Sequence, residues 1–182
     1  MKQQLQLFFR ALAYVIGLHI WCLVALSICR LIVLWANMPQ AGVDWSLLPT
    51  ALLIGIKFDN LIACYMSALP LIVVPVWALA TLHRQEYGQW MRGVVKGTSW
   101  YYSVVYSILL FVGVADARYY TFFDNHLNIG VTEWFGFVNE TAGIVFDDPV
   151  NLWFIGIAAA VIALYITGVL AIGKAYKKSL SV

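Results

Sequence analysis

The chain has 182 residues, of which 63% are hydrophobic and only 11% are charged, and its net charge is +2. Soluble globular domains carry roughly 25% charged residues, so this composition leaves too little polar surface to cover a compact body in water. It therefore excludes a soluble domain and predicts a protein that lies in a bilayer. The longest basic run is Lys177-Lys178, which is too short for a nucleic-acid-binding surface.

Four uncharged runs are long enough to cross a membrane, which takes about 20 apolar residues in a helix. The first of them is too long for the apolar core of a cleaved signal peptide, so we expect it to be an uncleaved anchor. No internal repeat or linker divides the chain, which predicts one all-α membrane domain over residues 1–182. We expect its spans at about 11–36, 60–83, 97–116 and 149–173.

The segment 45–58 is apolar but too short to cross unaided, and it leads into Lys57 and Asp59. It either lies at the interface or re-enters, or it makes an extra crossing. Lys and Arg accumulate on the cytoplasmic side of membrane proteins. A single crossing at 60–83 places eight of the eleven basic residues on one side, which favours an interfacial segment and cytoplasmic termini. These eight are Lys2, Arg10, Arg84, Arg92, Lys96, Lys174, Lys177 and Lys178.

The segment 117–148 is the second region that we expect at the interface, on the opposite side of the membrane. It is rich in aromatic residues interleaved with charged ones, a composition typical of helices that lie at headgroup depth. Such a segment offers polar groups to lipid headgroups or to a docked domain.

Asp116 follows the third span directly, where an unpaired carboxylate is costly. Arg118 and Lys57 are its nearest candidate partners in the sequence. One interpretation is that an ion pair fixes the loop to the second span. The other is that Lys57 and Arg118 neutralise a lipid phosphate while Asp59 and Asp116 orient them. Arg30, at the far end of the first span, either extends to the interface or offers its charge to a lipid phosphate.

The histidines and cysteines do not predict a metal site. Asp124 and His126 have a spacing that is weak evidence for metal ligands, and we expect His126 to form hydrogen bonds at the interface instead. His19 lies within the first span, where a neutral ring bonded to a neighbouring helix is expected. The three cysteines, Cys22, Cys29 and Cys64, occur in apolar runs and are expected to be small buried side chains.

Four short motifs resemble a known family. They are Gly55-x-Lys57-Phe58-Asp59, then Tyr65 and Pro70 in the following span, then Ala115-Asp116-x-x-Tyr119-Tyr120, then the DDPVNLW run of residues 147–153. Their order is similar to that in the N-terminal membrane region of lipoteichoic-acid-synthase-like proteins of Gram-negative bacteria, Bacteroidetes in particular. These proteins belong to the alkaline phosphatase and sulfatase superfamily, which includes phosphoglycerol and phosphoethanolamine transferases.

The resemblance implies a longer protein in the bacterial inner membrane, in which a further span precedes an extracytoplasmic catalytic domain. That domain would carry a threonine nucleophile and a divalent metal, Mn or Zn, whereas this chain would hold neither catalytic residues nor a cofactor. The membrane region would position a phospholipid donor. The expected lipid-binding residues are Lys57, Asp59, Asp116, Arg118 and Tyr119, followed by Tyr120 and Asp124.

A second hypothesis is a small membrane protein that acts alone as a scaffold or assembly subunit. The aromatic segment 117–148 would then bind a partner, and the chain could form homo-oligomers. A transporter is disfavoured because His19 is the one ionisable residue near the middle of a predicted span.

Overall fold

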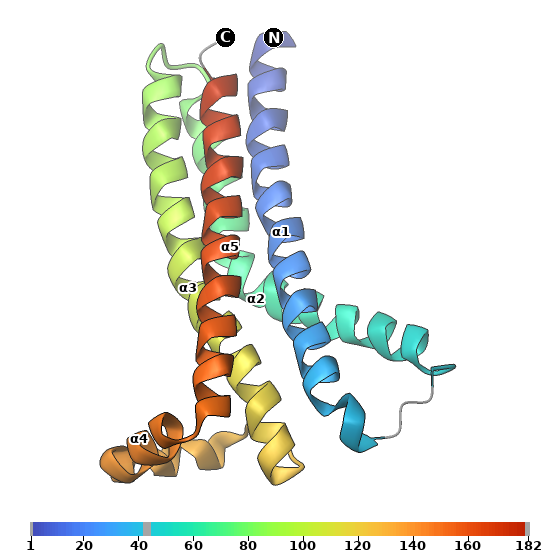
Figure 1. Cartoon of the computed structure of the whole chain (residues 1–182). Helices are drawn as coiled ribbons and strands as arrows, with labels where there is room; N and C mark the ends of the chain where they lie inside the picture. The colour runs from blue at the N-terminus through green and yellow to red at the C-terminus, as the bar shows by residue number, and fades with distance from the viewer. Residues whose placement is uncertain (1, 42–44, 181–182) are drawn as a thin grey trace.

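The computed structural model describes residues 2–41 and 45–180, which form an all-α bundle (Figure 1). Its long helices are α1 (Lys2–Ala41), α2 (Leu48–Thr81), α3 (Tyr87–Phe123) and α5 (Pro149–Ser179). A 3-10 helix, η1 (Ile129–Phe137), and the short helix α4 (Val138–Asp147) connect α3 to α5. All four long helices are apolar enough to cross a membrane. The predicted fold class and the predicted number of spans are therefore confirmed, and the chain is a multi-pass membrane protein.

The helices run so that the two ends of the bundle differ in charge. Figure 1 shows the start of α1, the α2–α3 turn and the end of α5 at one end, which we name the terminal end. The elements η1 and α4 lie across the other end, which we name the α4 end. Because of this arrangement, the three basic segments of the sequence share the terminal end, as the four-span topology requires.

Each long helix buries one narrow stripe and leaves its other sides exposed. On α2 the buried residues recur every three or four positions, which is the period of one helix face: Gly55, Asp59, Ala63, Ser67, Pro70, Val74, Ala78 and Thr81. Large apolar side chains elsewhere on the bundle are exposed, including Leu69 at 60% and Trp153 at 76%. A surface of this kind is stable when lipid covers it.

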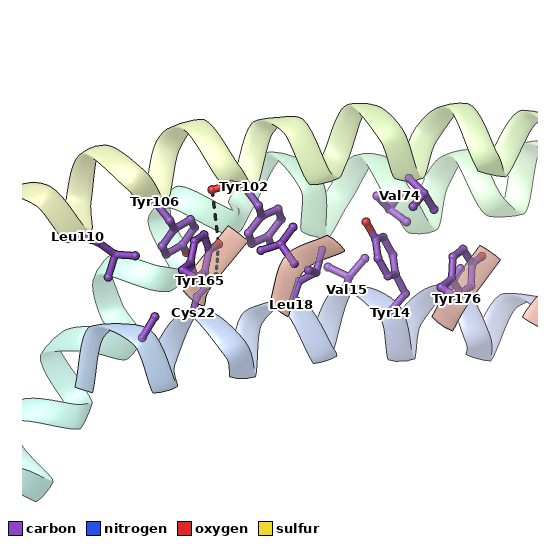
Figure 2. Close-up of a cluster of buried hydrophobic side chains, with 14 of the residues drawn as sticks. Tyr14, Val15, Leu18, Cys22, Val74, Tyr102, Tyr106, Leu110, Tyr165 and Tyr176 are labelled. Atoms are coloured by element: carbon purple, nitrogen blue, oxygen red, sulfur yellow. Dashed lines mark hydrogen bonds between the residues drawn. The ribbon is translucent and has the colours of Figure 1, made fainter. Parts of the chain in front are cut away.

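Tyrosines fill much of the bundle interior (Figure 2). The rings of Tyr102 and Tyr106 stack with centroids 5.5 Å apart, and the ring centroid of Tyr165 from α5 lies 5.6 Å from that of Tyr106. The Tyr165 hydroxyl donates to the Tyr102 carbonyl and lies 3.3 Å from Cys22 Sγ. A buried tyrosine hydroxyl usually finds a hydrogen-bond partner, and these contacts of Tyr165 join α1, α3 and α5.

Tyrosine hydroxyls also link α2 to α3. Pro70 has no N–H, so the carbonyl of Met66 one turn earlier lacks its usual helical donor. The Tyr101 hydroxyl on α3 donates to this carbonyl at 2.7 Å. Tyr106 donates to the Ala63 carbonyl at 3.2 Å, one turn earlier in α2. Neighbouring side chains thus satisfy the backbone where proline interrupts a helix in the membrane.

Two helices extend beyond the predicted segments. The residues 48–58 are the first part of α2 itself, with no break before the span predicted to begin at residue 60. In Figure 1 this part of α2, which we name the α2 arm, points away from the other helices at a large angle to the bundle axis. The helix α3 continues past residue 116 to Phe123, so the first part of segment 117–148 is helical too. A 37-residue helix is about 55 Å long, so its charged ends can extend beyond a hydrocarbon core of about 30 Å.

The cysteines follow the expectation in two of three cases. Cys22 and Cys29 are buried, whereas Cys64 is exposed, and all three are free. Cys64 is exposed because it lies beside Ala63, which faces α3, and successive helical residues point about 100° apart. The apolar residues near Cys64 in the sequence are therefore hydrophobic because many of them face the lipid, and not because they form the protein core.

A glycine on α5 brings α1 and α5 into close contact. The Trp21 indole N–H donates to the Tyr165 carbonyl at 3.0 Å, and the ring lies over Gly168. A Cβ at Gly168 would lie 2.5 Å from Trp21 Cζ2, closer than van der Waals contact permits.

We expect Gly168→Ala to displace Trp21 and to lower the free energy of unfolding by about 1–3 kcal/mol, the usual cost of overpacking. The matched control is Gly156→Ala on the same helix, where a new Cβ meets nothing within 4 Å. Melting temperatures in one detergent should fall for the first variant and hold or rise for the second. Equal melting temperatures for the two variants would contradict the close α1–α5 contact.

Candidate functional site

Arg118 is held at the α4 end by two residues of α5. Its Nη2 donates to Asp148 Oδ2 and its Nε donates to Asn151 Oδ1, both at 2.6 Å. Asp148 is also the N-cap of α5, because its Oδ1 accepts from the Val150 N–H at 2.9 Å, and Pro149 occupies the first helical position. One carboxylate therefore caps a helix and binds an arginine, which fixes the guanidinium relative to α5.

The guanidinium keeps unused hydrogen-bonding capacity. Arginine has five N–H donors, and the contacts with Asp148 and Asn151 use two of those on Arg118. Its carbon Cζ lies 5.5 Å from the centroid of the Phe122 ring, and its side chain is 20% exposed. Three N–H groups thus remain for an acceptor from outside the described residues, and the side chain that carries them is already ordered.

An apolar groove opens beside this arginine. It lies between the α4-end halves of α3 and α5 and the segment formed by η1 and α4, and its volume of about 1100 Å³ is at the upper limit of the sizes typical of ligand sites. Its walls are mostly aromatic and aliphatic, with three charged side chains, Arg118, Glu140 and Asp148. The aromatic walls include Phe111, Tyr119, Phe122, Phe137, Phe146 and Phe154. A groove of this chemistry suits a ligand with a long apolar part and a charged end.

Asp116 has a different partner from either predicted cation. Its Oδ2 lies 2.8 Å from His126 Nδ1, and its Oδ1 accepts from the Leu127 backbone N–H at 2.7 Å. The Tyr120 ring lies 4.8 Å from the His126 ring. Asp116 and Tyr120 therefore hold the chain where it turns away from α3, and His126 forms the interfacial hydrogen bond expected of it.

Asp124 ends α3. Its φ of 51° is left-handed, a conformation common just after a helix, and its N–H donates to the Tyr120 carbonyl at 2.9 Å. Its side chain is exposed. Its described role is to cap the helix, and it does not line the groove.

Asp59 pairs with Arg30 on α1, and not with Lys57 or Arg118. Arg30 donates to both carboxylate oxygens of Asp59, from Nη2 at 2.6 Å and from Nε at 3.2 Å, and also to the Gly55 carbonyl at 3.1 Å. A Cβ at Gly55 would lie 2.6 Å from Arg30 Cζ, so only glycine leaves room for the guanidinium. Gly55 and Asp59 are one turn apart, which places both on the face toward α1.

Lys57 lies on a different side of the same helix. Two residues from either Gly55 or Asp59, it is rotated about 200° away from them, and it is exposed. It makes no ion pair with any side chain that the structure describes. The expected grouping of Lys57 and Asp59 with Arg118 and Asp116 is therefore not formed, because each charge finds a nearer partner on an adjacent helix or loop.

Asp59→Asn should destabilise the contact between the α2 arm and α1. It leaves the Arg30 guanidinium, which is 37% exposed, without its charged partner, and we expect a loss of about 1–3 kcal/mol. Lys57→Gln, two residues away, is the control and should change the melting temperature little. In a double-mutant cycle with Arg30→Gln, a coupling energy near zero would show that the pair contributes nothing.

His19 forms a hydrogen bond between two helices of the bundle. His19 Nε2 lies 3.0 Å from Asn60 Oδ1 on α2, as predicted for a histidine within a span. Within the part of the chain that the structure describes, no three His, Cys, Asp or Glu side chains come together as metal ligands.

Sequence reasoning missed Asp148, Asn151 and Glu140. Asp148 was detectable, since Asp followed by Pro marks the start of a helix, and a residue at that position can face the end of the preceding span. Asn151 lies one turn later on the same helix. Glu140 gave no comparable signal, because its place beside the groove depends on how α4 lies across the bundle.

The comparisons with known proteins return no match. No family model matches the chain, and neither the curated proteins nor the solved structures contain a significantly similar one.

Proposed function

We propose that this chain is a membrane domain that holds a phospholipid at the outer face of a bacterial inner membrane and presents its headgroup to an extracytoplasmic catalytic domain. The observation that carries the proposal is the aromatic groove with Arg118 at its edge. An ordered guanidinium with free N–H groups binds a phosphate diester well, since its planar donors match two phosphate oxygens. The apolar walls would cover the first part of the acyl chains.

The resemblance supports the second half of the proposal. Two of the four motifs that resemble the phosphoglycerol and phosphoethanolamine transferases surround Arg118 and Asp148, and these two residues meet at the groove. In such a protein the membrane domain would raise the effective concentration of the lipid and orient its phosphate, and the chemistry would occur in the catalytic domain. That domain would carry the threonine nucleophile and the divalent metal.

The difference in charge between the two ends of the bundle supports the proposed orientation, with the α4 end on the extracytoplasmic side. The terminal end carries the basic segments, which favours the cytoplasm, and the α4 end then faces outward. Aromatic side chains such as Phe137 and Phe146, exposed at 64% and 63%, suit the headgroup layer of the outer leaflet.

The sidedness can be tested by cysteine labelling after replacement of the three native cysteines. We expect Glu140→Cys, at the α4 end, to react with a membrane-impermeant maleimide added outside intact spheroplasts. Glu86→Cys, in the α2–α3 turn, should react only after permeabilisation. The reverse pattern would place the groove in the cytoplasm and exclude an extracytoplasmic catalytic partner.

The lipid site can be tested by replacing its cation. In Arg118→Gln we expect retention of co-purified phospholipid, measured by native mass spectrometry, to fall about tenfold, which corresponds to about 1.4 kcal/mol. Lys57→Gln removes an exposed cation away from the groove and should leave retention unchanged. A loss in Lys57→Gln without a loss in Arg118→Gln would move the headgroup site to the α2 arm. If neither variant loses lipid, the scaffold hypothesis is favoured.

A further inference from the structure

We propose that the groove selects a zwitterionic phospholipid that bears a primary ammonium, a phosphoethanolamine headgroup, over an anionic phosphoglycerol headgroup. This inference rests on the proposed function and makes it more specific. It follows from the charges that line the groove and from which of them are already paired.

The groove holds one cation and two carboxylates. Of these, Arg118 and Asp148 neutralise each other across a 2.6 Å ion pair. Glu140 is exposed and forms no ion pair with a charged side chain among those that the structure describes. With respect to the described side chains, the site therefore offers three guanidinium N–H groups at one point and an unpaired carboxylate at another, and its charged wall residues sum to −1.

A zwitterionic headgroup matches this arrangement. Its phosphate can accept from Arg118 while its ammonium donates to Glu140, and the walls and the headgroup then carry complementary charges. Phe137 also lines the groove, so an aromatic ring lies in the same groove as the carboxylate. Aromatic faces attract ammonium groups as well.

An anionic headgroup matches less well. A phosphoglycerol headgroup carries the phosphate charge but no cation, so Glu140 would stay unpaired and would repel the lipid. The wider surroundings add to the repulsion. The residues from Asp116 to Asp148 include six acidic residues and one basic residue, Arg118. Surface charge of this sign lowers the local concentration of anionic lipid.

The test is competition between two lipids with identical acyl chains. The protein is reconstituted with equimolar phosphatidylethanolamine and phosphatidylglycerol, and retained lipid is identified by native mass spectrometry. We expect the ethanolamine lipid to be retained about fivefold more, the factor that corresponds to about 1 kcal/mol at 25 °C. In Glu140→Gln the ratio should approach one, and in Glu140→Lys it should invert. Asp147→Asn is the matched control: it removes an acidic residue of the same segment that does not line the groove, so it should change the ratio much less than Glu140→Gln does.

The results separate the two proposals. If Arg118→Gln lowers retention of both lipids but the wild type prefers phosphatidylglycerol, or Glu140→Gln changes nothing, the headgroup inference is wrong and the lipid site stands. If Arg118→Gln leaves both lipids bound, the proposed function itself is contradicted. Because Glu140 is exposed, its substitutions should not impair folding, and unchanged melting temperatures would verify this.

Discussion

The structure depends on the rule that a charge near the hydrocarbon core needs a partner of opposite charge. Arg118 illustrates it most clearly, since Asp148 and Asn151, both at the start of α5, accept hydrogen bonds from its guanidinium at 2.6 Å. This contact fixes the end of α3 against the start of α5, and the groove lies beside it. Arg30 and Asp59 apply the same rule between α1 and the α2 arm. The two pairs bring together helix segments that apolar packing alone would leave free to slide in lipid.

Within the bundle, tyrosine serves the same purpose without charge. The hydroxyls of Tyr101 and Tyr106 donate to carbonyls on α2, and that of Tyr165 donates to a carbonyl on α3. Within the hydrocarbon layer no water is present to donate to the Met66 carbonyl, which Pro70 leaves without its helical partner. The Tyr101 hydroxyl from α3 donates to it instead. The core therefore contains tyrosine hydroxyls that bond to backbone carbonyls, while large apolar side chains cover much of the surface.

The sequence predicts the fold well and the site in part. The number of spans follows from the lengths of the apolar runs, because the thickness of the bilayer sets how many apolar residues a spanning helix needs. Helix ends do not follow from it, since α3 continues through Asp116 and Arg118 once both have partners. The expected lipid-binding residues included Arg118 and Tyr119, which line the groove, but also Lys57, Asp59, Asp116, Tyr120 and Asp124, which do not. Pairing of these charges is a property of helix rotation and tertiary packing, and hydropathy contains no information about either.

The double role of Asp148 couples any ligand of Arg118 to the first turn of α5. A molecule that takes up the three spare N–H groups leaves the carboxylate in place, so α5 keeps its cap and gains stability from the occupied state. A molecule that pulls the guanidinium away from Asp148 would have to break this contact first. The α3–α5 junction thus distinguishes two ways of binding Arg118. A ligand that bonds to the unused N–H groups leaves the ion pair intact, whereas a ligand that competes with Asp148 must also disrupt the contact between α3 and α5.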